Sequence, residues 1–226
     1  MPQIIYEDNH LIVAVKPPNI PTQLDDSGDE DFQSILKNYI SVKYNKPGNV
    51  FLGMVQRLDR PVSGIMVFAR TSKAASRLAD SVRTRKIQKR YFAAVSGDVP
   101  EQGRLEHWLL KDSTKNMVTA HEREVPGSKK AVLSFKREAV TENGLSLISI
   151  DLETGRSHQI RVQCSTAGFP IWGDQRYNVS GSQTGQQIAL VATGLTFEHP
   201  VKKETMKFDI PLPNRLPWTY FGQSQR

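Results

Sequence analysis

Residues 56–64 read Gln-Arg-Leu-Asp-Arg-Pro-Val-Ser-Gly and precede the apolar run 65–69. The proline and the Ser-Gly pair indicate a loop that leads into a buried strand. Alternate side chains of an extended chain share a face, so Arg57 and Asp59 should point the same way. A neighbouring guanidinium favours the ionised carboxyl, which suits a nucleophile or a charge stabiliser better than a proton donor. The alternative is an ordinary surface ion pair, which is far commoner than a catalytic acid.

Further blocks join this stretch to a known family. The run QRLDRPVSGIMVFART resembles the HRLD-x-x-x-SG signature of the RluA-type pseudouridine synthases. Three later blocks are similar to that family in its order: KRYFAAVSG (89–97), TGRSHQIRVQCSTAGFPIWGDQRY (154–177) and LTFEHP (195–200). The opening IIYEDNHLIVAVKPPNIPTQ is similar too, so the resemblance covers nearly the whole chain. Gln56 stands where the family usually has His, which leaves Asp59 unaffected.

The resemblance implies an enzyme that breaks the glycosidic bond of a uridine in RNA, turns the base and rejoins it through C5. Asp59 would then be the catalytic carboxylate, and Arg156 the buried cation that keeps it ionised. Stacked RNA hides the reacting atoms, so the nucleotide must be flipped out, with Arg57 taking its place. Tyr91 would stack on the flipped uracil and bring a phenol near C5. The reaction needs no oxidant, metal or ATP, so we expect no cofactor.

Four more residues are expected to contact the substrate. His158 is expected to make a structural or RNA-backbone hydrogen bond, and Arg161 is a candidate to face phosphate. Lys89 and Arg90 end a group of cations within residues 83–90 that can contact successive phosphates. Cations that follow a helix also complement its dipole, and this reading remains open for each of them.

Composition favours a polyanionic partner. The 226 residues include 30 Lys+Arg against 23 Asp+Glu, a formal net charge of +7. Nucleic acid leads the possible partners, although excess basicity also occurs in proteins that bind none. We expect an RNA substrate, ribosomal or transfer RNA, and a monomer. The single cysteine, Cys164, excludes an internal disulfide and is predicted to be a buried thiol.

Several other classes of protein are disfavoured. The five histidines show no metal-ligand spacing, so we expect no metal. No apolar run approaches about 18 residues, and the N-terminus has no basic region followed by an apolar one, so we expect no membrane span or signal peptide and a cytoplasmic protein. A two-carboxylate glycosidase is disfavoured because this chain has no second acid in a comparably marked motif. An RNA-binding module with a dead site is disfavoured by the intact Asp, Tyr and Arg set.

Hydrophobic periodicity predicts an α+β fold with a largely antiparallel sheet and flanking helices. Lys16, at the end of a predicted strand, could line the site or cap the strand, and the second is favoured because such a lysine is usually solvated. The resemblance implies the bent sheet of a pseudouridine synthase catalytic domain, here one domain over residues 1–226 without a separate N-terminal RNA-binding domain. The predicted elements are a hairpin over 3–16, helices over 31–44 and 73–85, a helix opening at 154–156 and ending at Gly168, and strands over 50–55, 88–96, 104–110, 117–120, 128–140, 145–152, 188–198 and 205–210.

Overall fold

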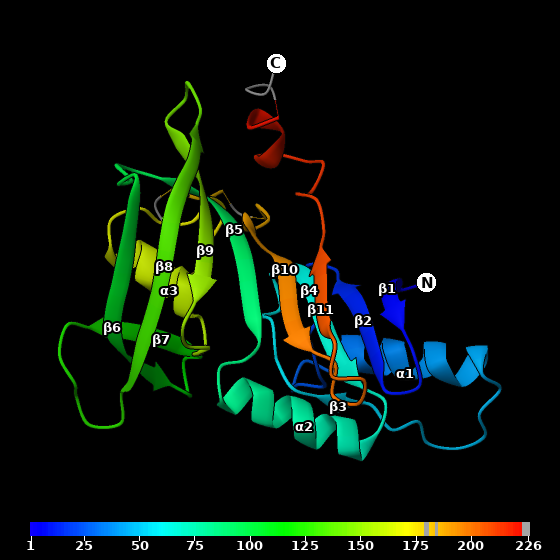
Figure 1. Ribbon diagram of the computed structural model, residues 1–226. Coiled ribbons are helices and arrows are strands. Elements are labelled where there is room, and N and C mark those ends of the chain that lie inside the picture. The colour runs from blue at the N-terminus through cyan, green and yellow to red at the C-terminus, as the bar shows by residue number, and fades with distance from the viewer. Residues whose placement is uncertain (179–180, 184, 223–226) are drawn as a thin grey trace. The chain divides into compact units, whose positions relative to one another are not determined.

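The computed structural model describes residues 1–178, 181–183 and 185–222 (Figure 1). The chain forms two compact units. The first comprises Met1–Lys89 and Ala192–Ile210, and the second comprises Arg90–Val191 and Pro211–Arg226. Helices and mostly antiparallel strands give a mixed α+β fold, which confirms the predicted fold class.

The first unit is a sheet with two helices. Its strands follow the order β1-β2-β4-β10, with β11 paired to β10 and β3 to β4. Every residue of β4 is buried, as expected for a continuous apolar run. The elements are β1 (Gln3–Glu7), β2 (Leu11–Lys16), α1 (Phe32–Lys43), β3 (Gly53–Met54), β4 (Ser63–Ala69), α2 (Ser72–Arg83), β10 (Leu190–Glu198) and β11 (Thr205–Asp209).

Helices α1 and α2 begin where the sequence predicts. The Asp31 carboxylate accepts a hydrogen bond from the Ser34 N–H at 3.0 Å, and the Thr71 hydroxyl accepts one from the Ala74 N–H at 3.2 Å. Both are N-caps that satisfy a donor of the first helical turn. Apolar residues of α2 pack with those of β2, β4 and β10, and this core comprises Leu11, Val13, Ile65, Val67, Ala69, Ala74, Leu78, Ile87, Leu195 and Phe197.

Gly64 allows β4 and β10 to lie close together. Its φ is +142°, and a Cβ at this position would clash with the backbone of Ala192 in β10. Any side chain at Gly64 would therefore push the two strands apart.

A histidine near the C-terminal end of β10 holds the N-terminal hairpin. The Nδ1 atom of His199 accepts hydrogen bonds from the Val201 and Lys202 N–H groups at 3.1 and 2.9 Å. Because Nδ1 is an acceptor, the proton lies on Nε2, which donates to the Asp8 carboxylate at 2.9 Å. Asp8 also accepts the backbone N–H groups of His10 and Leu11, so the hairpin turn and the end of β10 form one hydrogen-bonded group.

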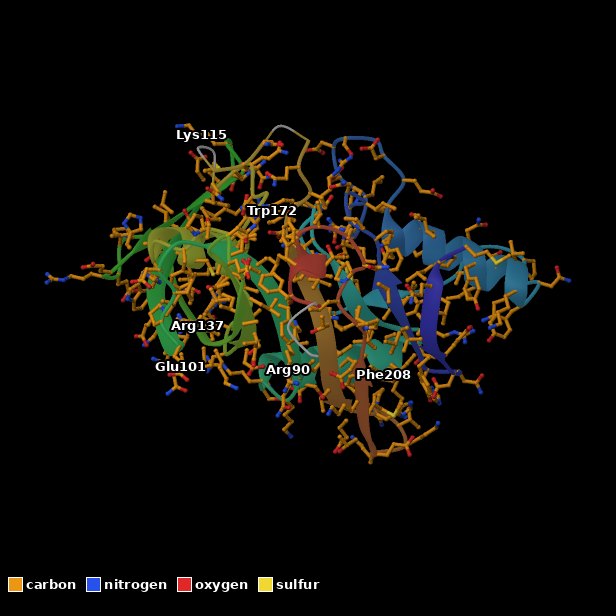
Figure 2. All side chains as sticks on the ribbon, turned by 90° about the horizontal axis from the view of Figure 1, so that it is seen from above. Arg90, Glu101, Lys115, Arg137, Trp172 and Phe208 are labelled. Carbon is orange, nitrogen blue, oxygen red and sulfur yellow. The ribbon has the colours of Figure 1, made fainter. Side chains whose placement is uncertain are left out.

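The described part of the second unit is an antiparallel sheet with one α-helix. Its strands follow the order β5-β9-β8-β6-β7. Arg137 of β8 fastens the segment before β6, because its guanidinium donates to the Val99 carbonyl at 2.5 Å and its N–H to that of Glu101 at 2.8 Å (Figure 2). The elements are β5 (Gln88–Ser96), β6 (Gln102–Asp112), β7 (Met117–His121), β8 (Lys129–Val140), β9 (Leu145–Leu152), α3 (Gln159–Thr166) and a 3-10 helix (Trp218–Tyr220).

The third helix begins later than predicted. It starts at Gln159, because His158 has φ +52° and breaks the helical path. The Gln159 side chain closes the preceding loop, since its Oε1 accepts the Thr154 hydroxyl at 2.9 Å and the Arg156 N–H at 3.0 Å. Cys164 lies in α3 and is fully buried, as predicted, and burial raises the pKa of its thiol to about 12.

Candidate active site

Asp59 lies in a loop between β3 and β4, within the first unit. The Asp59 carbonyl accepts the Val62 N–H at 3.0 Å, which closes a turn around Pro61. Arg57 is exposed and Asp59 is partly exposed, whereas Leu58 between them is buried. This is the alternation predicted for an extended chain. The stretch therefore presents Asp59 outward on a backbone that is held from within.

The residues on either side of Asp59 are bonded to the segment that follows β2. The Thr22 hydroxyl donates to the Leu58 carbonyl at 2.7 Å and accepts the Leu58 N–H at 3.2 Å. Lys16 Nζ donates to the Arg60 carbonyl at 3.1 Å. Lys16 therefore bonds backbone carbonyls at the end of its strand, which was the favoured of its two predicted roles. The expectation that its ammonium is solvated was wrong, because Lys16 is fully buried.

Two other residues of the motif, Arg60 and Gln56, have their own surroundings. The guanidinium of Arg60 forms an exposed ion pair with Asp29 and donates to the Ser27 hydroxyl at 3.0 Å. This surface pair is not the pairing of Arg57 with Asp59 that was considered above. Gln56, at the position where the family has His, is buried, and its Oε1 has no hydrogen-bond partner among the described residues.

Lys89, Arg90 and Tyr91 are adjacent on β5. Lys89, the last residue of the first unit, is partly buried, and burial lowers the pKa of its ammonium to about 8. Arg90 is exposed and lies opposite Asp151 of β9 (Figure 2). Tyr91 is 6% exposed and lies opposite Ile150. Among the cations that precede them in the sequence, Arg83 forms an ion pair with Asp80 of α2 at 2.6 Å. Arg83 therefore has a structural role within the helix.

Arg156 lies in the loop before α3, in the second unit. Its guanidinium Nε donates to the Lys130 carbonyl at 3.0 Å, and the residue is exposed, whereas a buried cation was expected from the sequence. The neighbouring His158 is held by its ring, with Nδ1 at 2.8 Å from the Tyr177 hydroxyl. That hydroxyl also accepts the Val118 N–H at 2.9 Å, and burial raises its pKa. His158 thus makes the structural hydrogen bond that was one of its two expected roles.

Arg161 is the buried cation of α3. Its Nε and one terminal nitrogen each lie 2.8 Å from a carboxylate oxygen of Asp174, a residue to which the sequence analysis gave no role. Asp174 also accepts the N–H groups of Arg176 and Tyr177 at 3.0 and 3.2 Å. Burial by itself would raise the pKa of Asp174, but these hydrogen bonds and the charge of Arg161 hold it below its usual value. The sequence feature that could have identified Asp174 is its position in GDQRY, the end of the family-like block 154–177.

Within the described ranges, no group of three or more His, Cys, Asp or Glu side chains is arranged to hold a metal ion. None of the helices in that part of the chain combines the length and the apolar character needed to cross a bilayer.

Comparison with known proteins identifies the family. A family model described as RNA pseudouridylate synthase matches residues 10–166. The chain is 34% identical over 218 residues to the uncharacterized RNA pseudouridine synthase YjbO of Bacillus subtilis, covering 94% of this chain and 73% of that protein. It is 32% identical over 224 residues to the ribosomal large subunit pseudouridine synthase D of Zymomonas mobilis, covering 95% and 70%.

Solved structures show the same fold. The human RNA pseudouridylate synthase domain containing 4 matches with a TM-score of 0.76 at 21% identity, covering 94% of this chain and 89% of that one. The human RNA pseudouridylate synthase domain containing 1 matches with a TM-score of 0.73 at 21% identity, covering 100% and 96%. Sequence and fold therefore agree that this chain belongs to the RluA-type family of RNA pseudouridine synthases.

Proposed function

We propose that this RNA pseudouridine synthase modifies specific uridines of structured RNA, with Asp59 as its nucleophile. The observation that carries the proposal is the position of Asp59, a partly exposed carboxylate in the motif loop whose two neighbouring residues are both anchored by hydrogen bonds. Ribosomal RNA is the favoured substrate because two relatives, which align with 95% and 94% of this chain, are named ribosomal large subunit pseudouridine synthases. Transfer RNA is the second candidate.

The proposed reaction is an isomerisation in which atoms and charges balance. The Asp59 carboxylate acts at the sugar, by attack on C1′ or by removal of the 2′ proton, and the N1–C1′ bonding electrons leave with uracil. The freed base turns, and C5 bonds to C1′ as the Asp59–C1′ bond breaks or, in the second route, as the proton returns to C2′. The C5 proton is then removed and N1 gains a proton. We assign Tyr91 to the base, as a stacking surface and as the hydroxyl near C5. Arg57 would fill the space that the flipped nucleotide leaves.

The cation that keeps Asp59 ionised has two candidates. We propose Arg156, whose guanidinium is exposed and is bonded to a neutral carbonyl, so its charge is not matched by an acid in any described contact. Arg161 is the second candidate because it is buried, where a charge acts more strongly, although Asp174 already pairs with it. We propose the remaining residues, His158, Lys89 and Arg90, as substrate-binding groups.

Single-turnover rates distinguish the two arginines. Loss of the cation that stabilises the negative charge of Asp59 should slow the chemical step without weakening RNA binding. We expect this loss for Arg156→Gln and not for Arg161→Gln, with each rate constant taken from the folded fraction. A slowed chemical step in Arg161→Gln alone would transfer the role to Arg161.

We further propose that residues 1–226 act as one catalytic domain, as a cytoplasmic monomer that needs no metal. Sedimentation across a tenfold concentration range should show a constant mass. Prolonged chelation should leave turnover unchanged, and loss of activity that added zinc or magnesium restores, with the RNA fold controlled, would refute the metal-free mechanism.

Asp59→Asn tests the central assignment, because it retains the shape of the side chain and removes its charge. Pseudouridines are first mapped in ribosomal and transfer RNA from cells with and without the gene, and the variant is then assayed on a transcript that carries the mapped uridine. Product should be absent while RNA binding and thermal unfolding match wild type. Asp98→Asn is the matched control, since Asp98 is an exposed acid whose loss changes net charge equally. Pseudouridine formed by Asp59→Asn would overturn the assignment.

A further inference from the structure

One short segment contacts the backbone on both sides of Asp59. We call residues 16–22, which read Lys-Pro-Pro-Asn-Ile-Pro-Thr, the proline segment. Its last residue, Thr22, bonds both the N–H and the carbonyl of Leu58, at 3.2 and 2.7 Å. Its first residue, Lys16, donates to the Arg60 carbonyl at 3.1 Å. The residues before and after Asp59, Leu58 and Arg60, are thus attached to opposite ends of the same segment.

The proline segment is itself rigid. Its three prolines fix the backbone φ angle at their positions. Besides Arg60, Lys16 Nζ donates to the carbonyls of Pro17 and Ile20 at 3.0 and 2.7 Å, which draws the segment together around the ammonium. An anchor that bends freely would not fix its partner, so this internal bracing matters for the loop that carries Asp59.

The far end of the segment is tied to α1. The Pro21 carbonyl accepts the Phe32 N–H at 2.8 Å, and the Thr22 carbonyl accepts the Gln33 N–H at 3.2 Å. Both donors lie in the first turn of the helix, where backbone N–H groups have no partner within the helix. Strand β2, the proline segment and α1 therefore form a continuous frame behind the Asp59 loop.

The choice of residues is not explained by packing. Lys16 is fully buried, and Thr22 and Leu58 are 5% and 8% exposed. A methionine would fill the volume of Lys16 but would leave three carbonyls without the N–H donors that the ammonium supplies. Burial lowers the pKa of Lys16 to about 7, and the nearby Asp59 carboxylate opposes that shift. The two charges therefore interact as well as the backbones.

We infer that Lys16 and Thr22 are positioning residues that fix the backbone of the residues on both sides of Asp59, Arg60 and Leu58, and so set its carboxylate before RNA binds. The inference rests on the proposed role of Asp59. A carboxylate held in this way loses only the freedom of its own short side chain on reaching the sugar. Misplacement of a reacting group by about 1 Å can cost about 100-fold in rate, so small movements of this loop matter.

Thr22→Val tests the inference because it removes the hydroxyl and keeps the branched shape. The assay is single turnover at saturating enzyme with the mapped transcript, which gives the rate constant of the bound complex, and thermal unfolding gives the folded fraction. We expect the rate constant to fall by about 10- to 100-fold with an unchanged folded fraction and less than a twofold change in RNA affinity. Thr22→Ser, which keeps the hydroxyl, should restore most of the rate.

Thr141 offers a matched control in the second unit. Its hydroxyl likewise bonds both backbone groups of one residue, accepting the Leu145 N–H at 3.0 Å and donating to the Leu145 carbonyl at 3.1 Å. Thr141→Val should lower the melting temperature without changing the rate constant. Lys16→Met is the second variant, expected to lose at least as much rate as Thr22→Val, with its rate constant taken from the folded fraction.

Two results would overturn the inference. One is a wild-type rate constant in Thr22→Val while Asp59→Asn is inactive, which would leave the nucleophile in place and reject its anchoring. The other is a reduced folded fraction with an unchanged rate constant, which would show that Thr22 supports folding alone. Activity in Asp59→Asn would instead reject the proposed function, so the two failures are distinguishable.

Discussion

Arg161 and Asp174 form a two-point ion pair inside the second unit, with two N–O distances of 2.8 Å and side chains that are 6% and 1% exposed. The pair joins α3 to the turn after Gly173, and so connects the two ends of the sequence block 154–177. Asp174 in turn accepts two backbone N–H groups of that turn. One carboxylate thereby fixes both the guanidinium of Arg161 and the path of the chain around it.

Asp174→Asn should be strongly destabilising, because it removes one charge of a buried, two-point ion pair. Breaking a buried pair from one side costs about 3–5 kcal/mol of unfolding free energy. The loss of unfolding free energy is measured by urea unfolding. Asp80→Asn is the control, since Asp80 pairs with Arg83 on the surface and that pair should contribute far less. Equal losses in the two variants would contradict the structural role of Asp174.

The same carboxylate predicts how stability responds to acid. The pKa of Asp174 is lower in the folded chain than in the unfolded one, so the unfolded state binds more protons as pH falls. Its contribution is present above the unfolded value of about 3.9 and is lost as pH falls through the folded pKa. Urea midpoints measured from pH 6 to pH 3 should therefore decline less steeply in Asp174→Asn than in wild type. Urea midpoints that decline in parallel in the two proteins would contradict the lowered pKa of Asp174 in the folded chain.

Tyr91→Phe separates stacking from proton chemistry. The ring remains, so RNA binding should change by less than about 1 kcal/mol. If the hydroxyl removes the C5 proton or positions the water that does, turnover should fall by roughly two orders of magnitude. Release of tritium from C5-labelled RNA measures this step. Tyr6→Phe, which loses a hydroxyl bonded to Asp8, is the control. Release at the full rate would leave Tyr91 as a stacking surface only.

The charge balance predicts salt-dependent RNA binding. Arg85 and Lys86 are exposed, and each cation that neutralises a phosphate contributes about 0.7–0.9 to the slope of log K against log salt. The double variant Arg85→Gln/Lys86→Gln should therefore reduce the slope by about 1.4–1.8. Lys203→Gln is the control because Glu198 already pairs with that ammonium at 3.0 Å. An unchanged slope in the double variant would remove these two cations from the RNA-binding surface.

Features encoded in neighbouring residues were predictable from the sequence. The cap and apolar face of α2 come from residues a few positions apart in the sequence, with Thr71 as the N-cap. The turn at Gly144, where φ is +80°, follows from the Asn-Gly pair. The family was predicted from four motifs in order, and the comparisons confirm it.

Features that depend on distant residues were missed. The start of α3 was placed too early because the loop before it is closed by Gln159, a side chain that the helical pattern does not distinguish. The burial of Lys16 depends on Arg60, 44 residues away, and the role of Thr22 depends on Leu58, 36 residues away. Such pairings exist only once the sheet has formed. The catalytic roles of Asp59, Tyr91 and Arg156 stay predictions until the variants are measured.

The hydrogen bond between Asp8 and His199 has a consequence for biosynthesis. It spans 191 positions, and the first unit is completed only by Ala192–Ile210. The ribosome therefore synthesises Arg90–Val191, the long segment of the second unit, before the first unit can complete its sheet. This reverses the usual order of folding, in which the N-terminal unit folds first. Nascent chains arrested before β10 has emerged should leave β2 sensitive to protease, and chains extended past Ile210 should protect it. Strand β4, which follows the Asp59 loop, would be among the first strands made and would gain its neighbour β10 only late.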